Sequence, residues 1–520
     1  MKRRRSEPVD LTPAQLAERE RYEADQAMHA ALAKKPSRVG ARGWSGQGAG
    51  AAGYISPPTD WRGSTVQVCG LWPFAAGSGV PTIGVPLGRY LGPNGHGSTV
   101  CCDPISWFER TSLILNPSMF VLGLPALGKS TLVRRMSLGL SGFGVLPMFF
   151  GDLKPDYVDL VEAMGGQVIR LGRGRGGLNV LDPGGAAAAA ERLQGKAKIA
   201  VLADMKARRE TMVGALLTIA RRTPPTVHEE NIVSAALRVL DDKHDGVPIL
   251  GDLLRVIREA PEELRRVALD RGDMDRYRDA THDLEASLMA LTGDDRLGTM
   301  FNAPTSVAMD MGRPVVFDVS AVDESDKDLQ AATLMACWST GFGAINVSHA
   351  LADAGLEPQR RYFIVLDELW RALRSGPGMV DRVDALTRLN RQMGVGQAMI
   401  SHTMSDLQAL PNPEDRMKAR GFVERAGFVV CGGLPEGEMK DLTTAVGMSQ
   451  AEQQLLMSWS SPATWDTGGT SAPPARGKFL IKVGSRPGIP VQVQLTEAER
   501  AVNDTNKRWA QIDRPAAQVV

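Results

Sequence analysis

Short apolar runs alternate with segments of helical spacing along most of the chain. Apolar runs typical of strands are SMFVLG, VLPMFFGD and GQVIRLG before residue 182, and RPVVFDVS, RYFIVLDE, QAMISH, RAGFVVCGG and GKFLIKVG after residue 311. Between the early runs, KSTLVRRMSLGL and DYVDLVEAMGG carry apolar residues at helical spacing. This alternation predicts an α/β fold with a mostly parallel sheet covered by helices on both faces.

The other segments differ in composition and predict the domain organisation. We expect a charged helical arm, a flexible linker, a β-rich lead-in, the first part of a core, an all-helical insertion, the second part of the core with the closing strands, and a tail. In that order they span residues 1–37, 38–63, 64–110, 111–184, 185–300, 301–510 and 511–520.

Composition narrows the class of protein. Hydrophobic residues make up 43% of the 520 residues, which is enough for a sizeable core, and the formal net charge is +1. A net charge this small does not favour a generic nucleic-acid binder, although local basic patches remain open. Four arginines form such basic spots, and we interpret them as solvated side chains: Arg134, Arg135, Arg173 and Arg175.

Targeting and metal signals are absent from the sequence. The basic start MKRRRSE lacks a following apolar run and is not a secretory signal. No stretch of about 18 apolar residues predicts a membrane-spanning helix. The five cysteines are scattered without a CxxC spacing, which favours reduced thiols and no zinc site. We therefore expect a cytoplasmic protein.

One segment carries a specific chemical signal. Residues 123–130 satisfy the pattern G-x-x-x-x-G-K-[ST], with an apolar run before it and a helical segment after it. Gly123 and Gly128 let the backbone approach an anion closely. Lys129 would reach the β- and γ-phosphates, the Ser130 hydroxyl would ligate Mg²⁺, and Thr131 would lie near the α-phosphate. The alternative is a Gly-rich turn that contains Lys-Ser, which the strand and helix on either side disfavour.

An acidic pair supplies a second part of a nucleotide site. Asp367 and Glu368 end the apolar run Phe363–Leu366. Asp367 would bind Mg²⁺ through water, and Glu368 would orient and deprotonate the attacking water. An ordinary strand-to-loop turn is the alternative, and the phosphate loop upstream disfavours it.

Two further positions are candidates for catalysis. His402 ends QAMISH, a strand expected beside the Asp367 strand, and could touch the γ-phosphate; a satisfied, partly buried histidine is equally compatible. Arg391, in preference to Arg388, could stabilise transition-state charge in a neighbouring subunit's site. Two solvated helix arginines are the simpler alternative.

Beyond these motifs, the chain resembles the conjugative type IV secretion ATPases of the TraC class, within the FtsK–HerA superfamily of P-loop motors. The resemblance covers about residues 64–510 and includes LDELWRAL with Trp370, the segment 149–183 with Asp152, and TIGVPLGRYLGPNGHGSTVCCDPISW with Asp103. Two further segments carry it: GTMFNAPTSVAMDMGRPVVFDVSAV and GKFLIKVGSRPGIPVQVQLTEAE.

The resemblance implies a RecA-like core that binds ATP and Mg²⁺ at the interfaces of a hexameric ring. It also implies a place at the cytoplasmic face of a DNA or protein transfer machine, peripheral to the inner membrane and in contact with its components. The sequence departs from the family at His402, where Gln is common, at Tyr157, where Glu is common, and at NVLDP, which replaces Asn-Pro. Sister coupling proteins usually carry N-terminal membrane helices, so their absence from the sequence favours the TraC-like assignment.

Three functions follow from these expectations. The first is an ATP-hydrolysing motor of a secretion machine. The second is a nucleotide-gated assembly protein in which binding matters more than turnover. The third is a stand-alone DNA translocase, which would require DNA contact.

Overall fold

The computed structural model forms two compact units, residues 1–75 and 76–520. In the first unit, residues 20–24 and 26–27 are helical, and strands β1 (Val39–Gly40) and β2 (Gly43–Trp44) pair antiparallel. All elements discussed below belong to the second unit. The structure describes residues 20–24, 26–27, 39–40, 43–44, 81–92, 95–293, 297–376, 379–387, 394–410, 412–461 and 475–502.

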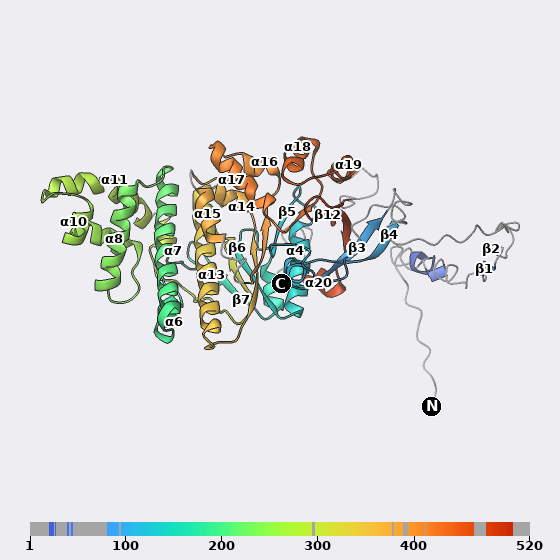
Figure 1. Ribbon diagram of the computed structural model, residues 1–520, viewed down its shortest axis with the longest axis horizontal. Helices are drawn as coiled ribbons and strands as arrows, with labels where there is room; N and C mark the ends of the chain where they lie inside the picture. The colour runs from blue at the N-terminus through green and yellow to red at the C-terminus, as the bar shows by residue number, and fades with distance from the viewer. Residues whose placement is uncertain are drawn as a thin grey trace, which may run out of the picture. The chain divides into compact units, whose positions relative to one another are not determined.

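One large sheet organises the second unit (Figure 1). In spatial order its strands are β4, β3, β13, β12, β11, β5, β10, β9, β6, β8 and β7. Strands from β11 to β7 run parallel, whereas β12, β13, β3 and β4 pair antiparallel at the other side. The predicted mostly parallel sheet is confirmed, and the lead-in and closing strands form its antiparallel part.

In chain order the strands of this sheet are β3 Pro86–Gly92, β4 Gly95–Cys101, β5 Ser118–Leu122, β6 Val145–Asp152, β7 Gln167–Arg170, β8 Val315–Asp318, β9 Arg361–Leu366, β10 Gly396–Ile400, β11 Phe428–Cys431, β12 Lys478–Lys482 and β13 Ile489–Val493. The helices of the core are α3 Pro104–Glu109, α4 Lys129–Gly142, α5 Val158–Ala163, α13 Lys327–Asp353, α14 Leu369–Leu373, α15 Met379–Thr387, α16 Met404–Gln408, α17 Pro413–Glu424, α18 Glu436–Ala445, α19 Gln450–Ser458 and α20 Glu497–Val502.

Helices cover both faces of the sheet, as the buried strand sequences require. Successive residues of β6 point to opposite sides: Phe149 packs in the core cluster with α3, α4 and α5, and Phe150 packs in the cluster with α13, α14 and α16 to α18. A strand buried on both faces is apolar at every position, which is why VLPMFFGD shows no polar alternation. The two clusters are the two halves of one α/β core.

The order β5, β10, β9 and β6 decides where chemistry can occur. All four strands are parallel neighbours, with Val121 level with Ile400, and Met399 level with Leu366. Their carboxyl ends therefore lie along one edge of the sheet, where ligands bind in folds of this kind. The expectation that the His402 strand lies beside the Asp367 strand is confirmed, because β10 pairs with β9.

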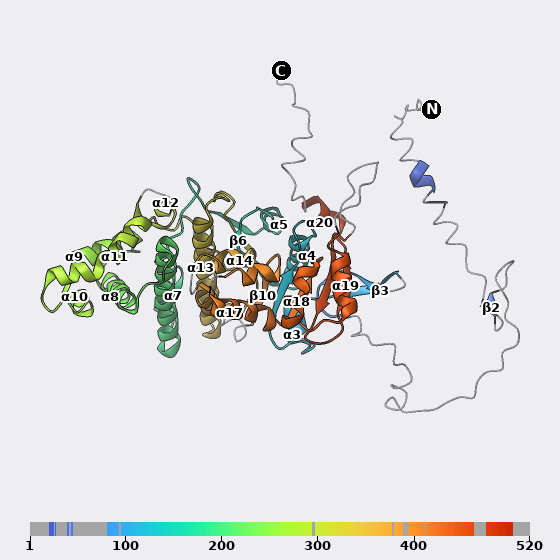
Figure 2. The same cartoon turned by 90° about the horizontal axis from the view of Figure 1, so that it is seen from above.

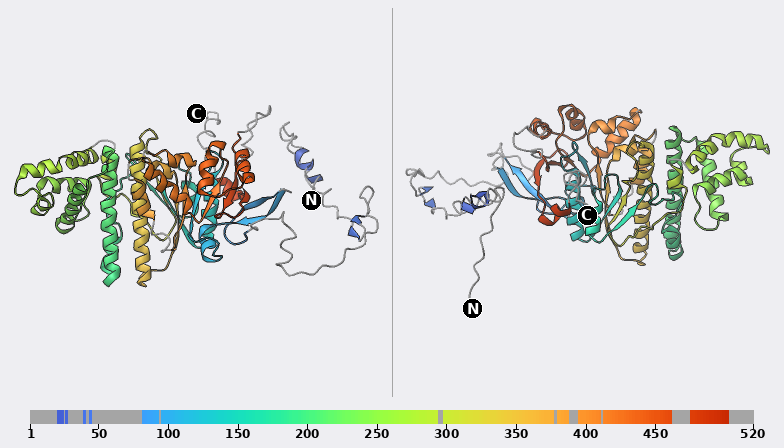
Figure 3. Two further views of the ribbon diagram at one scale, coloured as in Figure 1. Left: turned by 45° about the horizontal axis from the view of Figure 1, so that its top comes forward. Right: turned by 180° about the vertical axis from the view of Figure 1, so that it is seen from behind.

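A helical insertion follows the first half of the core. Its helices are α6 Ala186–Arg192, α7 Gly195–Arg221, α8 Val227–Lys243, α9 Leu250–Glu259, α10 Glu262–Val267, α11 Met274–Thr292 and α12 Gly298–Phe301. Among the described residues of 185–300 no strand occurs. The long helix α7 lies alongside α13, and α8 to α11 lie beyond it, away from the sheet (Figures 2 and 3).

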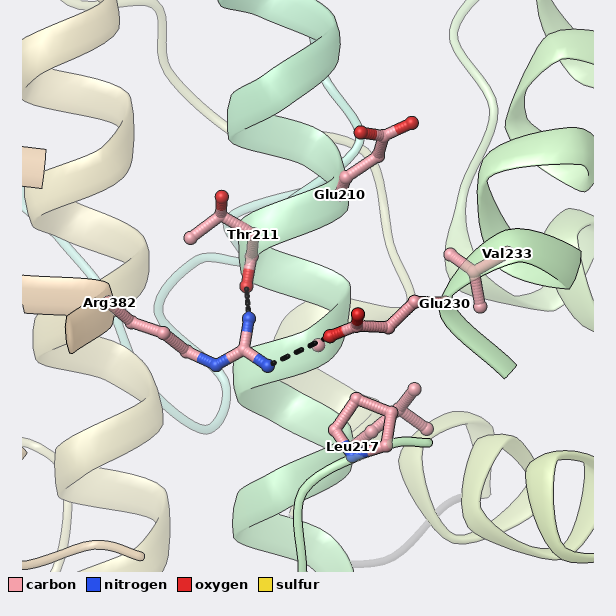
Figure 4. Close-up of a pocket in the computed structure, with 8 residues that line it drawn as sticks. Glu210, Thr211, Leu217, Glu230, Val233 and Arg382 are labelled. Atoms are coloured by element: carbon pink, nitrogen blue, oxygen red, sulfur yellow. Dashed lines mark hydrogen bonds and ion pairs between the residues drawn. The ribbon is translucent and has the colours of Figure 1, made fainter. Parts of the chain in front are cut away.

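Arg382 is one of the side chains that join the insertion to the core. Arg382 of α15 crosses α7 and donates to the Thr211 carbonyl oxygen at 3.2 Å, and its guanidinium lies 3.7 Å from the Glu230 carboxylate of α8 (Figure 4). A Cβ at Gly214 would lie 2.6 Å from Arg382 Nη1, so a larger residue there would displace the guanidinium from this crossing. The second helix after the acidic pair, α15, is thus in direct contact with the insertion.

Close packing of α13 on β6 generates a prediction about stability. A Cβ at Gly341 would lie 2.3 Å from Phe150 Cζ, so Gly341→Ala should lower the free energy of unfolding by about 1–2 kcal/mol despite the better helix propensity of alanine. Urea-induced unfolding measures it. Gly343→Ala, two residues along the same helix, is the control: its nearest neighbour would be Arg208 Cδ at 3.4 Å, so it should raise stability by about 0.5–1 kcal/mol. Equal effects at both positions would contradict this packing.

Candidate functional site

The loop between β5 and α4 has the backbone of an anion-binding turn. Gly123 has φ 157° and Gly128 has φ 95°, and a Cβ at Gly123 would lie 3.2 Å from Gly432 Cα. The Gly477 N–H donates to the Leu127 carbonyl at 2.9 Å, which fixes the loop against the start of β12. Both glycines of the pattern are therefore required by backbone geometry and close approach.

The start of α4 is positively polarised toward this loop. Gly128 is the N-cap and offers no side-chain oxygen to the first turn, so the first N–H groups of the helix face the loop. Ser130 and Thr131 lie in that turn. The helix start therefore provides donors of the kind that phosphate groups need, whereas the Gly123 and Leu124 N–H groups donate to the His402 and Gly433 carbonyls.

Lys129 lies at the centre of the site with little access to solvent. Its Nζ donates to the Gly123 carbonyl at 2.6 Å and to the Leu124 carbonyl at 3.2 Å, and lies 3.0 Å from His402 Nδ1. Burial lowers the pKa of Lys129 to about 8, although Asp367 and Glu368 act in the opposite direction. The ammonium group is surrounded by acceptors that a phosphate oxygen could replace.

Asp367 ends β9 next to the phosphate loop. Its Oδ2 accepts a hydrogen bond from the Tyr157 hydroxyl at 2.8 Å, and its Oδ1 accepts from the Glu368 N–H, also at 2.8 Å. Tyr157 is fully buried and its ring stacks on Phe149, which holds the hydroxyl in place. Burial, and then the charge of Glu368, raise the pKa of Asp367.

Glu368 has a strained backbone and a crowded carboxylate. Its φ is 52°, in the left-handed region that non-glycine residues seldom adopt, and its side chain is 9% exposed. Lys154 Nζ donates to Oε1 at 3.1 Å, Trp370 Nε1 donates to Oε2 at 2.6 Å, and His402 Nε2 lies 3.4 Å from Oε2. Burial alone would raise the pKa of Glu368, but His402 and Lys154 outweigh it and hold this pKa well below its usual range.

The loop after β6 contributes residues that the sequence patterns did not assign to the site. Asp156 Oδ2 accepts a hydrogen bond from the Ser130 hydroxyl at 2.8 Å. The Asp152 carboxylate accepts from the Asp156 and Tyr157 N–H groups at 2.9 and 2.7 Å, which shapes the turn. Burial raises the pKa of Asp152 to about 7. The sequence did contain a signal for this part of the site. Both VLPMFFGD and FIVLDE are apolar strand segments that end in an acidic residue.

The oxygen donors around Ser130 fit a magnesium ion better than a transition metal. Ser130, Asp156 and Asp367 offer hard oxygen atoms, and Mg²⁺ takes one or two carboxylates while its other ligands are phosphates and water. Over the described residues, no group of three or more His, Cys, Asp or Glu side chains is placed to hold a metal ion by itself. Such a site would therefore depend on a phosphate ligand for the rest of its coordination.

The structure brings most of the predicted site residues together. Those that converge on the carboxyl edge of the sheet are Gly123, Gly128, Lys129, Ser130, Thr131, Asp367, Glu368 and His402. Arg388 and Arg391 lie outside the described residues.

The interpretation of the basic spots as solvated side chains is wrong for two of the four arginines. The Arg135 side chain is only 19% exposed, pairs with the Glu499 carboxylate at 2.5 Å and donates to the Pro86 carbonyl at 2.9 Å. Arg134 is 5% exposed and donates to the carbonyl oxygens of Asp156 and Val502, so it is a buried link between α4, the loop after β6 and α20. It faces inward because it lies on the core side of α4, which the sequence pattern alone did not indicate. Arg173 and Arg175 are exposed.

Comparisons with known proteins agree with this architecture. No family model and no curated protein matches the chain. Among solved structures, VirB4 of Thermoanaerobacter pseudethanolicus matches with a TM-score of 0.59 and 18% identity, covering 81% of this chain and 100% of that chain. The chain has the VirB4 fold.

A weaker match is the plasmid coupling protein TrwB in complex with ADP and Mg²⁺, with a TM-score of 0.47 and 14% identity over 81% of this chain and 97% of that chain. The VirB4 likeness confirms the predicted fold class, a core of mixed α/β type with a large, mostly parallel sheet. None of the helices in the described ranges combines the length and apolar character needed to cross a membrane.

The contact between Tyr157 and Asp367 generates a prediction. Tyr157→Phe should lower the free energy of unfolding by about 1.5–3 kcal/mol, because a buried carboxylate loses a donor while the ring stacking remains. Tyr277→Phe is the matched control, since Tyr277 is equally buried and donates to the neutral Ile257 carbonyl at 2.7 Å. Its loss should be about 0.5–1.5 kcal/mol. Denaturant unfolding compares the two, and equal losses would show that Asp367 is not an ionised acceptor.

Proposed function

We propose that this chain is a Mg²⁺-dependent P-loop ATPase. The observation that carries the proposal is the convergence of Lys129, Ser130, Asp367 and Glu368 at the carboxyl ends of two parallel strands that are separated only by β10. A buried cation beside the first N–H groups of α4 suits a polyphosphate, and two adjacent acids at the same edge suit its metal ion and an attacking water.

Each residue has a definite role in this proposal. Lys129 exchanges the Gly123 and Leu124 carbonyls for phosphate oxygens and stabilises their charge. Ser130 and Asp367 hold Mg²⁺, which neutralises charge on the phosphates when bound. Glu368 orients a water molecule and takes its proton. His402 lies between Lys129 and Glu368 and can couple phosphate contact to the position of the glutamate.

The host process follows from the fold and from the motif order together. The VirB4 fold and the TraC-like segments support an energising ATPase of a conjugative type IV secretion machine. In that setting the chain works as a homo-oligomer, with a hexamer as the expected ring, in the cytoplasm and in peripheral contact with inner-membrane components. Arg391 would then complete a neighbouring subunit's site. The proposal does not depend on contact with DNA, in keeping with the small net charge of +1.

A nucleotide-gated assembly protein is the second candidate. The observation that favours it is the Glu368 carboxylate, which is bound by Lys154 and Trp370 and therefore not free to activate water in this arrangement. In that case nucleotide binding at Lys129 would order the assembly, and turnover would be slow.

Steady-state hydrolysis separates the two candidates. Glu368→Gln should reduce the kcat for ATP by about 10²- to 10⁴-fold, because the general base is lost, while ATP binding persists. Lys129→Ala should abolish binding as well. Colorimetric phosphate release measures turnover over a protein concentration series, with and without DNA.

Glu162→Gln is the matched control, because Glu162 is an exposed acid outside the site, paired with Arg170 at 3.1 Å. Its turnover should equal that of the unmodified protein. Tight ATP binding with no hydrolysis in any condition would contradict the ATPase proposal and favour nucleotide-gated assembly.

A further inference from the structure

The Glu368 carboxylate is held by groups from three separate segments. Trp370 follows it in the chain, His402 ends the neighbouring strand β10, and Lys154 belongs to the loop after β6 on the other side. Between them they contact both oxygens of a side chain that is only 9% exposed. A general base must offer an oxygen to water, and here both oxygens already have a donor nearby.

Lys154 differs from the other two in how easily it can leave. Its side chain is 48% exposed, and it reaches Glu368 as a flexible chain across the surface. Trp370 is anchored by its position in α14, with Arg371 and Arg374 each 4.8 Å from its ring centre. A half-exposed lysine can exchange a carboxylate for water without moving through the protein, whereas the partly buried Trp370 N–H cannot. Of the three contacts to the Glu368 carboxylate, the one with Lys154 is therefore the easiest to break.

The loop after β6 also contacts the start of α4. Asp156 accepts from Ser130, Tyr157 donates to Asp367, and Lys154 donates to Glu368, all within residues 152–157. Anything that draws the Ser130 hydroxyl away from Asp156 removes one of the three anchors of this loop. Ligand binding at the start of α4 and release of the Glu368 carboxylate are then linked through residues 152–157.

We propose that Lys154 is a positioning residue that restrains Glu368, and that hydrolysis requires this contact to open. The inference rests on the proposed function, since Glu368 is taken as the group that activates water. It assigns Lys154 a restraining role toward the carboxylate, in place of contact with phosphate. Lys154 lowers turnover in the resting arrangement and leaves the affinity for nucleotide unchanged.

Two measurements on Lys154→Met test the proposal. The first is steady-state kinetics with ATP and Mg²⁺, which gives kcat and KM separately. We expect kcat to rise about two- to fivefold and KM to stay unchanged. This range is the rate change that corresponds to the free energy of one ion pair with an exposed lysine. The second needs no nucleotide. Carbodiimide labelling of Glu368 in the presence of glycinamide, quantified by mass spectrometry, should become severalfold faster because the carboxylate is uncovered.

Two control variants show that the effect belongs to this contact. Lys154→Arg retains the cation and should behave as the unmodified protein in both measurements. Lys243→Met removes an ion pair of almost the same length, 3.2 Å to Glu263, on a lysine that is 59% exposed in the insertion, and should change neither. The double variant with Glu368→Gln should lose the gain in kcat.

The outcomes separate this inference from the proposed function. A fall in kcat with a rise in KM would show that Lys154 contacts phosphate and would overturn the restraint, as would unchanged labelling in Lys154→Met. Faster labelling without hydrolysis in any variant would leave the restraint standing and overturn the ATPase proposal. Faster labelling together with a higher kcat supports both.

Discussion

The parallel pairing of β5, β10, β9 and β6 is the constraint on which the candidate site depends. A parallel register fixes the level at which each strand ends, and here the levels agree to within a residue between β10 and its two neighbours. The loop 123–130 and the acidic pair follow their strands directly, His402 lies two residues after β10, and Asp152 is the last residue of β6. Because the strands are buried on both faces, their register is also the one that fills the two core clusters. The packing of the core therefore also sets the positions of the candidate site residues at this edge.

The charge pattern at the edge is unfavourable without a ligand, and the chain compensates locally. Asp152, Asp156, Asp367 and Glu368 lie close together, and each has a donor: amides, a hydroxyl, a tyrosine or a lysine. Burial without such donors would be costly for any of them. A bound metal ion and phosphates would replace several of these internal contacts, so ligand binding and rearrangement of the loop after β6 are expected to occur together.

The sequence predicted the parts of this structure that depend on local patterns. The glycine-rich turn between β5 and α4, the acid-terminated strand FIVLDE and the helical insertion each have a short-range signature, and the pairing of β10 with β9 followed from the α/β rhythm. The sequence could not predict the contacts between loops. The hydrogen bonds of Ser130 with Asp156 and of Lys154 with Glu368 join segments whose distance in space depends on turn geometry. Arg134 shows the same limit, since helical spacing places it only roughly and the fold turns it inward. The segment with Arg391 stays a prediction.

A structure with a non-hydrolysable ATP analogue and Mg²⁺ tests the central claim most directly. The account predicts that the triphosphate lies in the loop 123–130, that Lys129 Nζ exchanges the Gly123 carbonyl for phosphate oxygens, and that the Ser130 hydroxyl leaves Asp156 for the metal ion. A nucleotide bound elsewhere, or a Lys129 that keeps its contact with Gly123 while the analogue is bound, would contradict it.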